Sequence, residues 1–118
     1  MQRIQLKSKF HRAIISQADI EYEGSIEIPG DLMDKVDLWD GERVLVTSMT
    51  AGGRLETYAQ RGPEGTGQII MNGGAAHLIK KGERVTIMAF GISDEKIIAK
   101  RLVMNDDNEI VKSSGMDH

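Results

Sequence analysis

Short apolar stretches alternate with glycine-containing turns along most of the chain. Ile26 and Ile28 occupy alternate positions, which is the spacing of a strand with one buried face. The residues Thr50-Ala51-Gly52-Gly53 separate two such stretches and are typical of a hairpin turn. The pattern therefore predicts a small, mainly β protein. Strands are expected at residues 3–7, 12–17, 25–28, 43–49, 54–60, 68–71, 84–90, 101–104 and 109–111.

Helical segments are expected to be few and short. Asp31 has the character of a helix N-cap, because Leu32 and Val36 then fall on one helical face. Two further helical turns are predicted at residues 75–78 and 93–99. This many short strands with so few helices favours a barrel over an open sheet, although the pattern alone does not give the topology.

Composition and charge narrow the class of function. Hydrophobic residues make up 40% of the 118 residues, which is enough for one core, and a single domain is expected to span residues 1–118. The net charge of −3 argues against a protein that binds duplex DNA through its phosphates. Aromatic residues are only 4%, too few for a platform that stacks single-stranded bases. No nucleic-acid partner is expected.

Several kinds of site and location are excluded by what the chain lacks. It has no cysteine, which rules out a disulfide scaffold, a thiol nucleophile and a thiolate zinc site. Its histidines, His11, His77 and His118, show no metal-site spacing, so no metal is expected. The longest apolar run, Ile87–Phe90, is too short to span a membrane, and MQRIQLKSKF lacks a signal-peptide core. A cytoplasmic protein without a membrane partner is expected.

The most unusual stretch is Tyr22-Glu23-Gly24-Ser25. A Gly-Ser pair before a strand is by itself most often a turn, because glycine reaches backbone angles that other residues avoid. A chemical role for Ser25 therefore needs support from elsewhere in the chain.

That support comes from five pieces of sequence, which occur in a fixed order and spacing. They are Lys9-Phe10-His11-Arg12; Asp19 to Ser25; Thr50, Gly52, Arg54, Thr57 and Tyr58; Asn72-Gly73 with Ala75-Ala76-His77; and Asp107-Asn108-Glu109-Ile110. Together they resemble the pyruvoyl-dependent aspartate 1-decarboxylase family along nearly the whole chain. The resemblance implies a six-stranded double-psi β-barrel with short helices. It also implies a homotetramer with active sites shared between subunits.

The resemblance implies a proenzyme that cuts its own chain. Ser25 Oγ would attack the carbonyl of Gly24, and the resulting ester would eliminate and hydrolyse to a pyruvoyl group. Glycine leaves the attack unobstructed and tolerates a strained backbone, and serine supplies the β-oxygen that is eliminated. The tetrahedral oxyanion requires placed donors. In the family Thr57 is the candidate, with His11 and Tyr22 nearby.

The cut would leave residues 1–24 as a β chain and residues 25–118 as an α chain that begins with the pyruvoyl group. No pyridoxal phosphate is implied. By the resemblance, the ketone forms a Schiff base with L-aspartate and accepts the electrons released as CO2 leaves. Tyr58 then donates a proton to the carbanion, which gives β-alanine for pantothenate and coenzyme A synthesis.

The resemblance also implies a substrate site. Arg54 would hold a carboxylate through paired N–H donors, and Lys9 would add positive charge. Read without the family, Arg54 and Tyr58 are a same-face strand pair of a common surface type. Thr57 would point to the opposite face from Tyr58, so either a strand irregularity or two different subunits' sites must reconcile them. The remaining lining is expected from Asn72, Gly73, Gly74 and Ala75.

Four positions depart from the family's usual pattern: Thr47, Ser48, Ala51 and Gly74. They leave open the substrate preference and the rate of self-cleavage, as well as any need for a separate maturation protein. One alternative is a related decarboxylase that prefers another acidic amino acid such as L-glutamate, since one methylene changes discrimination by only ~1–3 kcal/mol. A second is a non-catalytic double-psi barrel that serves as a binding module. A small DNA-binding β dimer is a third, disfavoured by the acidic charge.

Overall fold

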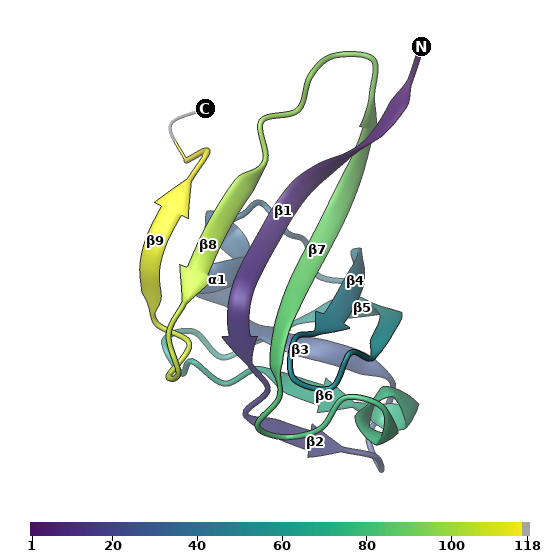
Figure 1. Ribbon diagram of the computed structural model, residues 1–118, viewed down its shortest axis with the longest axis vertical. Coiled ribbons are helices and arrows are strands. Elements are labelled where there is room, and N and C mark those ends of the chain that lie inside the picture. The colour runs from purple at the N-terminus through teal and green to yellow at the C-terminus, as the bar shows by residue number, and fades with distance from the viewer. Residues whose placement is uncertain (117–118) are drawn as a thin grey trace.

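Nine strands, one short α-helix and one 3-10 turn form the part of the chain that the computed structural model describes, residues 1–116 (Figure 1). His118 lies outside these residues. No helix within them is long and apolar enough to cross a membrane. In chain order the elements are β1 (Arg3–Ile14), β2 (Gln17–Asp19), β3 (Ser25–Pro29), α1 (Gly30–Lys35), β4 (Arg43–Ser48), β5 (Arg54–Gly62), β6 (Ile70–Asn72), η1 (Gly73–His77), β7 (Arg84–Ser93), β8 (Lys100–Met104) and β9 (Ile110–Ser114).

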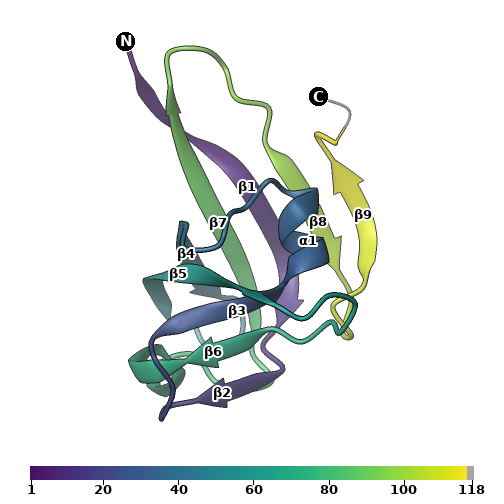
Figure 2. The same ribbon diagram turned by 180° about the vertical axis from the view of Figure 1, so that it is seen from behind.

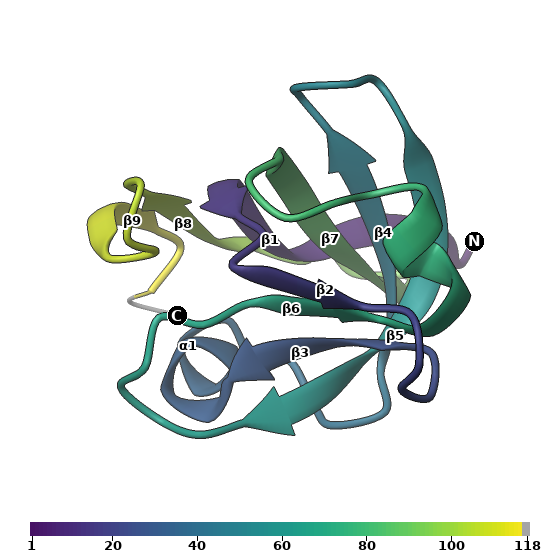
Figure 3. The ribbon, with the colours of Figure 1, turned by 90° about the horizontal axis from the view of Figure 1, so that it is seen from below.

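The strands form one mixed sheet in the order β2-β6-β3-β5-β4-β7-β1-β8-β9. The pairs β1–β8, β2–β6 and β3–β5 are parallel, and the other neighbours are antiparallel. Seen from below, β2, β6 and β3 lie beneath β1, β7 and β4, so the sheet folds over on itself (Figure 3). The apolar core fills the space between. Its members include Phe10, Ala13, Ile26, Ile28, Val46, Met71, Ile87 and Leu102.

The first strand is longer than predicted. Residues 3–7 and 12–17 were expected as separate strands, but β1 runs from Arg3 to Ile14 with a bulge between Phe10 and Ala13. The polar residue Ser8 interrupts the apolar pattern that would predict one continuous strand. Its side chain is nevertheless buried and donates a hydrogen bond to the Val36 carbonyl at 2.6 Å. A serine whose hydroxyl is satisfied in this way can occupy an inward-facing strand position.

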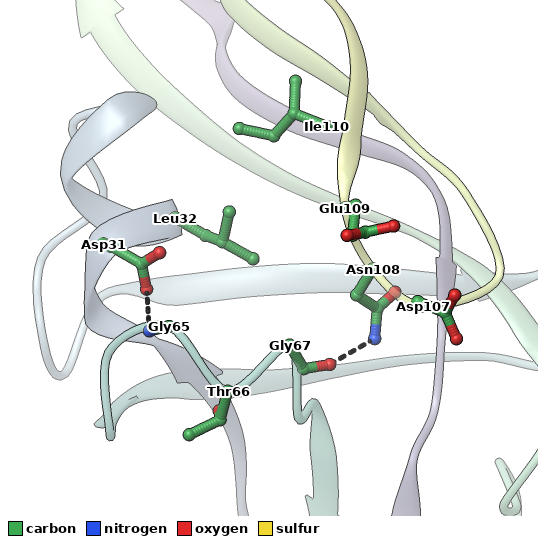
Figure 4. Close-up of a pocket in the computed structure, with 9 residues that line it drawn as sticks. All are labelled: Asp31, Leu32, Gly65, Thr66, Gly67, Asp107, Asn108, Glu109 and Ile110. Atoms are coloured by element: carbon green, nitrogen blue, oxygen red, sulfur yellow. Dashed lines mark hydrogen bonds between the residues drawn. The ribbon is translucent and has the colours of Figure 1, made fainter.

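The helix α1 begins differently from the prediction. Asp31 is not the N-cap: that position is Pro29, which makes no side-chain capping bond. The Asp31 carboxylate instead accepts a hydrogen bond from the Gly65 backbone N–H at 3.0 Å (Figure 4). This bond ties the helix to the loop after β5. In the reverse view α1 lies at the end of β3, near β8 (Figure 2).

The helical turn predicted at residues 93–99 is absent from the described structure, and that prediction was wrong. The strand β7 continues to Ser93, and the following segment is irregular. The Gln5 side chain satisfies this segment, donating to the Glu95 carbonyl at 2.9 Å and accepting from the Ile97 N–H at 2.9 Å. A distant side chain thus replaces the local bonds that a helix would have supplied.

The turn between β8 and β9 is fixed by the buried side chain of Asn108. Its Oδ1 accepts from the Ile14 N–H at 2.7 Å, and its Nδ2 donates to the Ile14 carbonyl at 2.9 Å. The same Nδ2 donates to the Gly67 carbonyl at 2.8 Å (Figure 4). Asn108 has φ 56°, a left-handed conformation that asparagine tolerates better than most residues. One side chain therefore joins the end of β1 to two loops.

Candidate active site

Ser25 begins β3 and its side chain is fully buried. Its Oγ donates a hydrogen bond to Gln60 Oε1 at 2.7 Å and accepts one from Asn72 Nδ2 at 3.4 Å. Ser25 and Asn72 are also opposite each other in the antiparallel β3–β6 ladder. Three strands that neighbour one another in the sheet, β6, β3 and β5, thus bring these polar side chains together.

Gln60 was missed by the sequence reasoning. It lies two residues beyond Tyr58 on β5, so its side chain points to the same face of the strand. That spacing was the only signal in the sequence. The contact itself depends on the parallel pairing of β3 with β5, which the hydrophobic pattern does not specify.

The register of β3 against β5 places the expected catalytic tyrosine beside Ser25. Ile26 is opposite Ala59 in this parallel pair, so one step back along both strands sets Ser25 beside Tyr58. Tyr58 is partly exposed on the same face as Ser25, as a proton donor to a bound substrate must be.

Thr57 and Tyr58 point to opposite faces of β5. The β4–β5 ladder is regular from Arg43 opposite Tyr58 to Thr47 opposite Arg54, so no bulge reconciles the two within this ladder. Thr57 is half-buried on the inward side, next in the chain to the partly exposed Tyr58. Its side chain therefore faces away from the Tyr58 side.

The loop after β6 packs closely on the expected cleavage segment. Gly73 has φ 74°, and a Cβ at this position would lie 2.6 Å from Gly24 Cα and 3.1 Å from the Tyr22 carbonyl oxygen. Gly73 therefore has to be glycine for two independent reasons. Gly74 has neither a positive φ nor a close contact, since a Cβ there would meet nothing within 4 Å. The half-buried Ala75 packs against the core.

In the uncut chain neither a close contact nor a left-handed backbone requires glycine at position 24. A Cβ there would meet nothing within 4 Å, and its φ is outside the positive range. The close contact between these two segments instead requires glycine at position 73, whose Cβ would meet Gly24.

Lys9 and His11 lie in a separate place. Both are on β1, where Lys9 is opposite Arg101 of β8, and together with Lys112 they line a cavity of about 200 Å³. In the sheet order, β1 is separated from β3 by β5, β4 and β7. Within one chain the structure does not bring these two residues to Ser25.

The environment of His11 favours a neutral ring. Burial lowers the pKa of His11, and the positive charges of Lys9 and Arg12 lower it further. Among residues 1–116, its buried Nδ1 has no hydrogen-bond partner.

Arg54, which is expected to bind the substrate, lies at the tip of a hairpin whose turn is held by hydrogen bonds. Arg54 begins β5, four residues before Tyr58, which corresponds to roughly 13 Å along a strand. Ser48 is buried at the turn, donates to Glu83 Oε1 at 2.5 Å and accepts from the Ala51 N–H at 3.1 Å. Gly52 has φ 79°, so it occupies the left-handed position of the turn in place of Ala51.

Comparison with known proteins bears on the whole chain. Residues 1–111 match the model of a family described as aspartate decarboxylase. The chain is 42% identical over 111 residues to the aspartate 1-decarboxylase of Pseudothermotoga lettingae, covering 92% of this chain and 96% of that protein. It is 44% identical over 112 residues to that of Thermotoga petrophila, covering 95% and 98%. With that of Bacillus thuringiensis the identity is 38% over 121 residues, covering 99% and 95%.

Proposed function

The chain belongs to the aspartate decarboxylase family, and on that premise we infer that it is an aspartate 1-decarboxylase. It is a lyase that converts L-aspartate to β-alanine and CO2 and supplies pantothenate biosynthesis. The similarity spans nearly the full length of this chain and of its relatives, so the inference concerns the whole protein rather than a part.

The observation that carries a self-processing mechanism is the setting of Ser25. Its buried Oγ is held between an acceptor, Gln60, and a donor, Asn72, directly beside the Gly24 carbonyl in the chain. In the cleavage Oγ bonds to the Gly24 carbonyl carbon, and the bond from that carbon to the Ser25 nitrogen breaks. The Oγ proton is lost and the released nitrogen gains one, so the ester forms with no net change in protons. Thr57, Tyr22 and His11 are the proposed donors around the oxyanion.

The surroundings of Ser25 fit the group that the family forms at this position. When present, a pyruvoyl group at residue 25 supplies an electron sink for the loss of CO2. Asn72 Nδ2 is a donor already directed at this residue. Tyr58 lies on the same strand face, where its phenol can donate a proton to the α-carbon of the substrate. No metal or pyridoxal phosphate has a proposed role.

The carboxylates of the substrate are assigned to two cationic side chains. Arg54 offers paired N–H donors at the hairpin tip, and Lys9 contributes a point charge. The η1 turn adds backbone N–H groups from Gly73, Gly74 and Ala75. An amino acid with two carboxylates suits such a site, because each can meet a separate positive or donor group.

A homotetramer with sites between subunits accounts for the separation of Lys9 and His11 from Ser25. Their cavity opens on β1, β8 and β9, on the far side of β7 and β4 from β3. A second copy could bring this cavity to Ser25. Three exposed apolar side chains on β1 and β7, Ile4, Phe90 and Ile92, offer a surface that another copy would cover.

We also propose that the folded-over sheet is the six-stranded double-psi barrel implied by the resemblance. The support is the path of the chain between β1 and β2. The strand β2 lies at one end of the sheet order, yet only Ile15 and Ser16 separate it from β1, near the other end. Ser16 continues the link by donating its N–H to the Ile69 carbonyl at 2.7 Å. The chain itself therefore joins the two ends of the sheet. The cytoplasm stays the expected compartment for this reaction.

The test is intact mass under denaturing conditions, before and after the purified protein is warmed. We expect the 13.0 kDa chain to give two species, residues 1–24 and residues 25–118 with a pyruvoyl group at the start. The Ser25→Ala variant should stay whole, and Ser93→Ala, a change at the half-buried end of β7, should cleave normally. The cleaved protein should release β-alanine from L-aspartate faster than it decarboxylates L-glutamate.

The alternatives have distinct results. A wild-type chain that stays whole after prolonged warming, also with candidate maturation proteins added, would favour a binding module. Cleavage followed by faster turnover of L-glutamate would favour the decarboxylase with the other substrate. A normal rate of cleavage in Ser25→Ala would overturn the assignment of Ser25.

A further inference from the structure

We propose that Gln60 is a positioning residue for the self-cleavage reaction, holding the Ser25 hydroxyl in the conformer that attacks Gly24. The inference rests on the proposed self-processing function. It adds a residue that none of the five family-like pieces contains.

The strand pairing explains why Gln60 reaches Ser25. Glu27 is opposite Gln60 in the parallel β3–β5 ladder, so Ser25 is the diagonal neighbour of Gln60 on the same face. A diagonal pair is within reach of a side chain as long as glutamine. The result is the 2.7 Å hydrogen bond from Ser25 Oγ to Gln60 Oε1. At this distance it is the shorter of the two bonds that Oγ makes, since Asn72 Nδ2 is at 3.4 Å.

Gln60 accepts a hydrogen bond from Ser25 Oγ, whereas Asn72 donates one to it. A serine hydroxyl has one proton and two lone pairs. Gln60 takes the proton and Asn72 donates to one lone pair, so the other lone pair is left for the Gly24 carbonyl carbon. Burial of Ser25 removes water as a competing acceptor.

The chemistry of the step requires this control. Attack closes a five-membered ring of Ser25 Oγ, Cβ, Cα and N with the Gly24 carbonyl carbon, and it is accessible from only part of the Ser25 side-chain rotation. Ser25 has three staggered conformers, and a fixed acceptor on β5 selects among them. A neutral carboxamide does not carry the proton away, because the proton balance closes on the leaving nitrogen of Ser25. Gln60 therefore acts through Ser25 and is not itself a catalytic residue.

The experiment compares the rate of self-cleavage in three variants by intact mass. Gln60→Met keeps the length of the side chain and removes the acceptor. Gln60→Glu keeps an acceptor and makes it ionisable. Glu56→Gln is the matched control, since it alters a polar residue on the same face of β5 at an exposed position that pairs with Arg43.

We expect Gln60→Met to cleave about tenfold more slowly than the wild type, the effect of losing roughly one net hydrogen bond together with the orientation it gives. Glu56→Gln should cleave at the wild-type rate. The ratio of the Gln60→Glu rate to the wild-type rate should rise with pH as the new carboxyl ionises, because a carboxylate both accepts more strongly and can take the proton. The ionisable groups that face the same position, Glu27 of β3 and Tyr58 of β5, are present in both proteins, so taking the ratio isolates the effect of the group at residue 60.

The outcomes separate this inference from the function on which it rests. Wild-type cleavage with an unchanged rate in Gln60→Met overturns the role of Gln60 and leaves self-processing standing. Absence of cleavage in every protein, the wild type included, overturns both. If Gln60→Met does not fold, the cleavage rate of Gln60→Glu relative to the wild type decides. A relative rate that does not change with pH overturns the inference, because a residue at position 60 with only a structural role would not couple the charge of the new carboxyl to the rate.

Discussion

Gly73 lies directly against Gly24: a Cβ on Gly73 would be 2.6 Å from the Gly24 Cα and 2.7 Å from its backbone nitrogen. The η1 turn that is expected to bind the substrate is thus also the wall against which the cleavage segment rests. A change at one glycine should consequently affect maturation before it affects turnover.

We expect Gly73→Ala to slow self-cleavage and to destabilise the uncut chain. The left-handed φ of 74° costs an alanine about 1–2 kcal/mol, and the contact with Gly24 adds to this. Gly74→Ala is the matched control, since a Cβ there meets nothing within 4 Å. The measurements are intact mass over time and urea unfolding in a Ser25→Ala background. Equal behaviour of the two variants would contradict the close approach.

Tyr58→Phe should separate turnover from maturation. Loss of the proton donor is expected to lower kcat for β-alanine formation by about 10²-fold, because general acid catalysis contributes about that much or more. Self-cleavage should continue at the wild-type rate, since Ser25 is held by Gln60 and Asn72. The assay measures β-alanine after cleavage has been verified by mass. Full activity of the phenylalanine variant would remove Tyr58 from the proposed mechanism.

The separation of Lys9 from Ser25 predicts that two defective chains restore one another. Lys9→Ala keeps a cleavable Ser25 but should bind substrate poorly, and Ser25→Ala keeps Lys9 but cannot mature. If a site takes Lys9 from one subunit and the Ser25-derived group from another, co-expressed chains should be more active than Lys9→Ala alone. Activity that only falls in proportion to the added Ser25→Ala chain would indicate that each site lies within one subunit.

The environment of His11 predicts a loss of stability in acid. Burial, followed by the charges of Lys9 and Arg12, lowers the pKa of His11 below its ordinary 6.5. Between that lowered value and 6.5 the unfolded chain binds more protons than the folded one, so the free energy of unfolding falls as the pH drops below 6.5 and is unaffected by this group above it.

The test is urea unfolding at about pH 7.5 and about pH 5.5, either side of the ordinary histidine pKa, in the uncleaved Ser25→Ala background. His11→Gln should lose less stability in acid than the parent, whereas His77→Gln, which changes the exposed histidine of η1, should behave like the parent. Equal losses in His11→Gln and the parent would contradict the direction of the shift.

Asn108→Ala should be among the most destabilising substitutions outside the site. It removes three hydrogen bonds, to the part-buried N–H and carbonyl of Ile14 and to the carbonyl of Gly67, at a cost of about 2–4 kcal/mol. Asp107→Ala, at the exposed neighbour, should cost far less. Urea midpoints in the Ser25→Ala background measure both. A loss below that of Asp107→Ala would show that water replaces these bonds.

The hairpin could be predicted from the sequence because its determinants are local. Gly52 takes the left-handed turn position, and the flanking strands lie close to the predicted bounds. The continuity of β1 could not be predicted, because Ser8 is polar yet its side chain is buried and bonded to the Val36 carbonyl. The helical turn predicted after β7 was wrong for a similar reason, since the distant Gln5 side chain makes hydrogen bonds with the backbone of that segment. Bonds between residues far apart in the chain leave no local pattern.

In the candidate site, too, some residues could be identified from the sequence and others depend on contacts between distant strands. Ser25, Asn72 and Gly73 could be identified by their resemblance to a family, and the structure places them together. Gln60 lies in no motif, and its contact with Ser25 arises only once β3 and β5 pair in parallel. Two ways of reconciling Thr57 with Tyr58 were expected, a strand irregularity or sites in different subunits, and the regular β4–β5 ladder shows no irregularity between these two residues.

The enclosure of β1 between β7 and β8 determines whether the proposed cut comes before or after folding. Residues 1–24 contribute a strand enclosed by β7 and β8 and a second strand against β6, and they bury Phe10, Ala13 and Ile15. A peptide threaded in this way cannot depart after the cut without opening the core. The proposed cut must therefore follow folding. It would leave two interlocked pieces, and once they unfold and separate, recovery would be a bimolecular encounter instead of the folding of one chain.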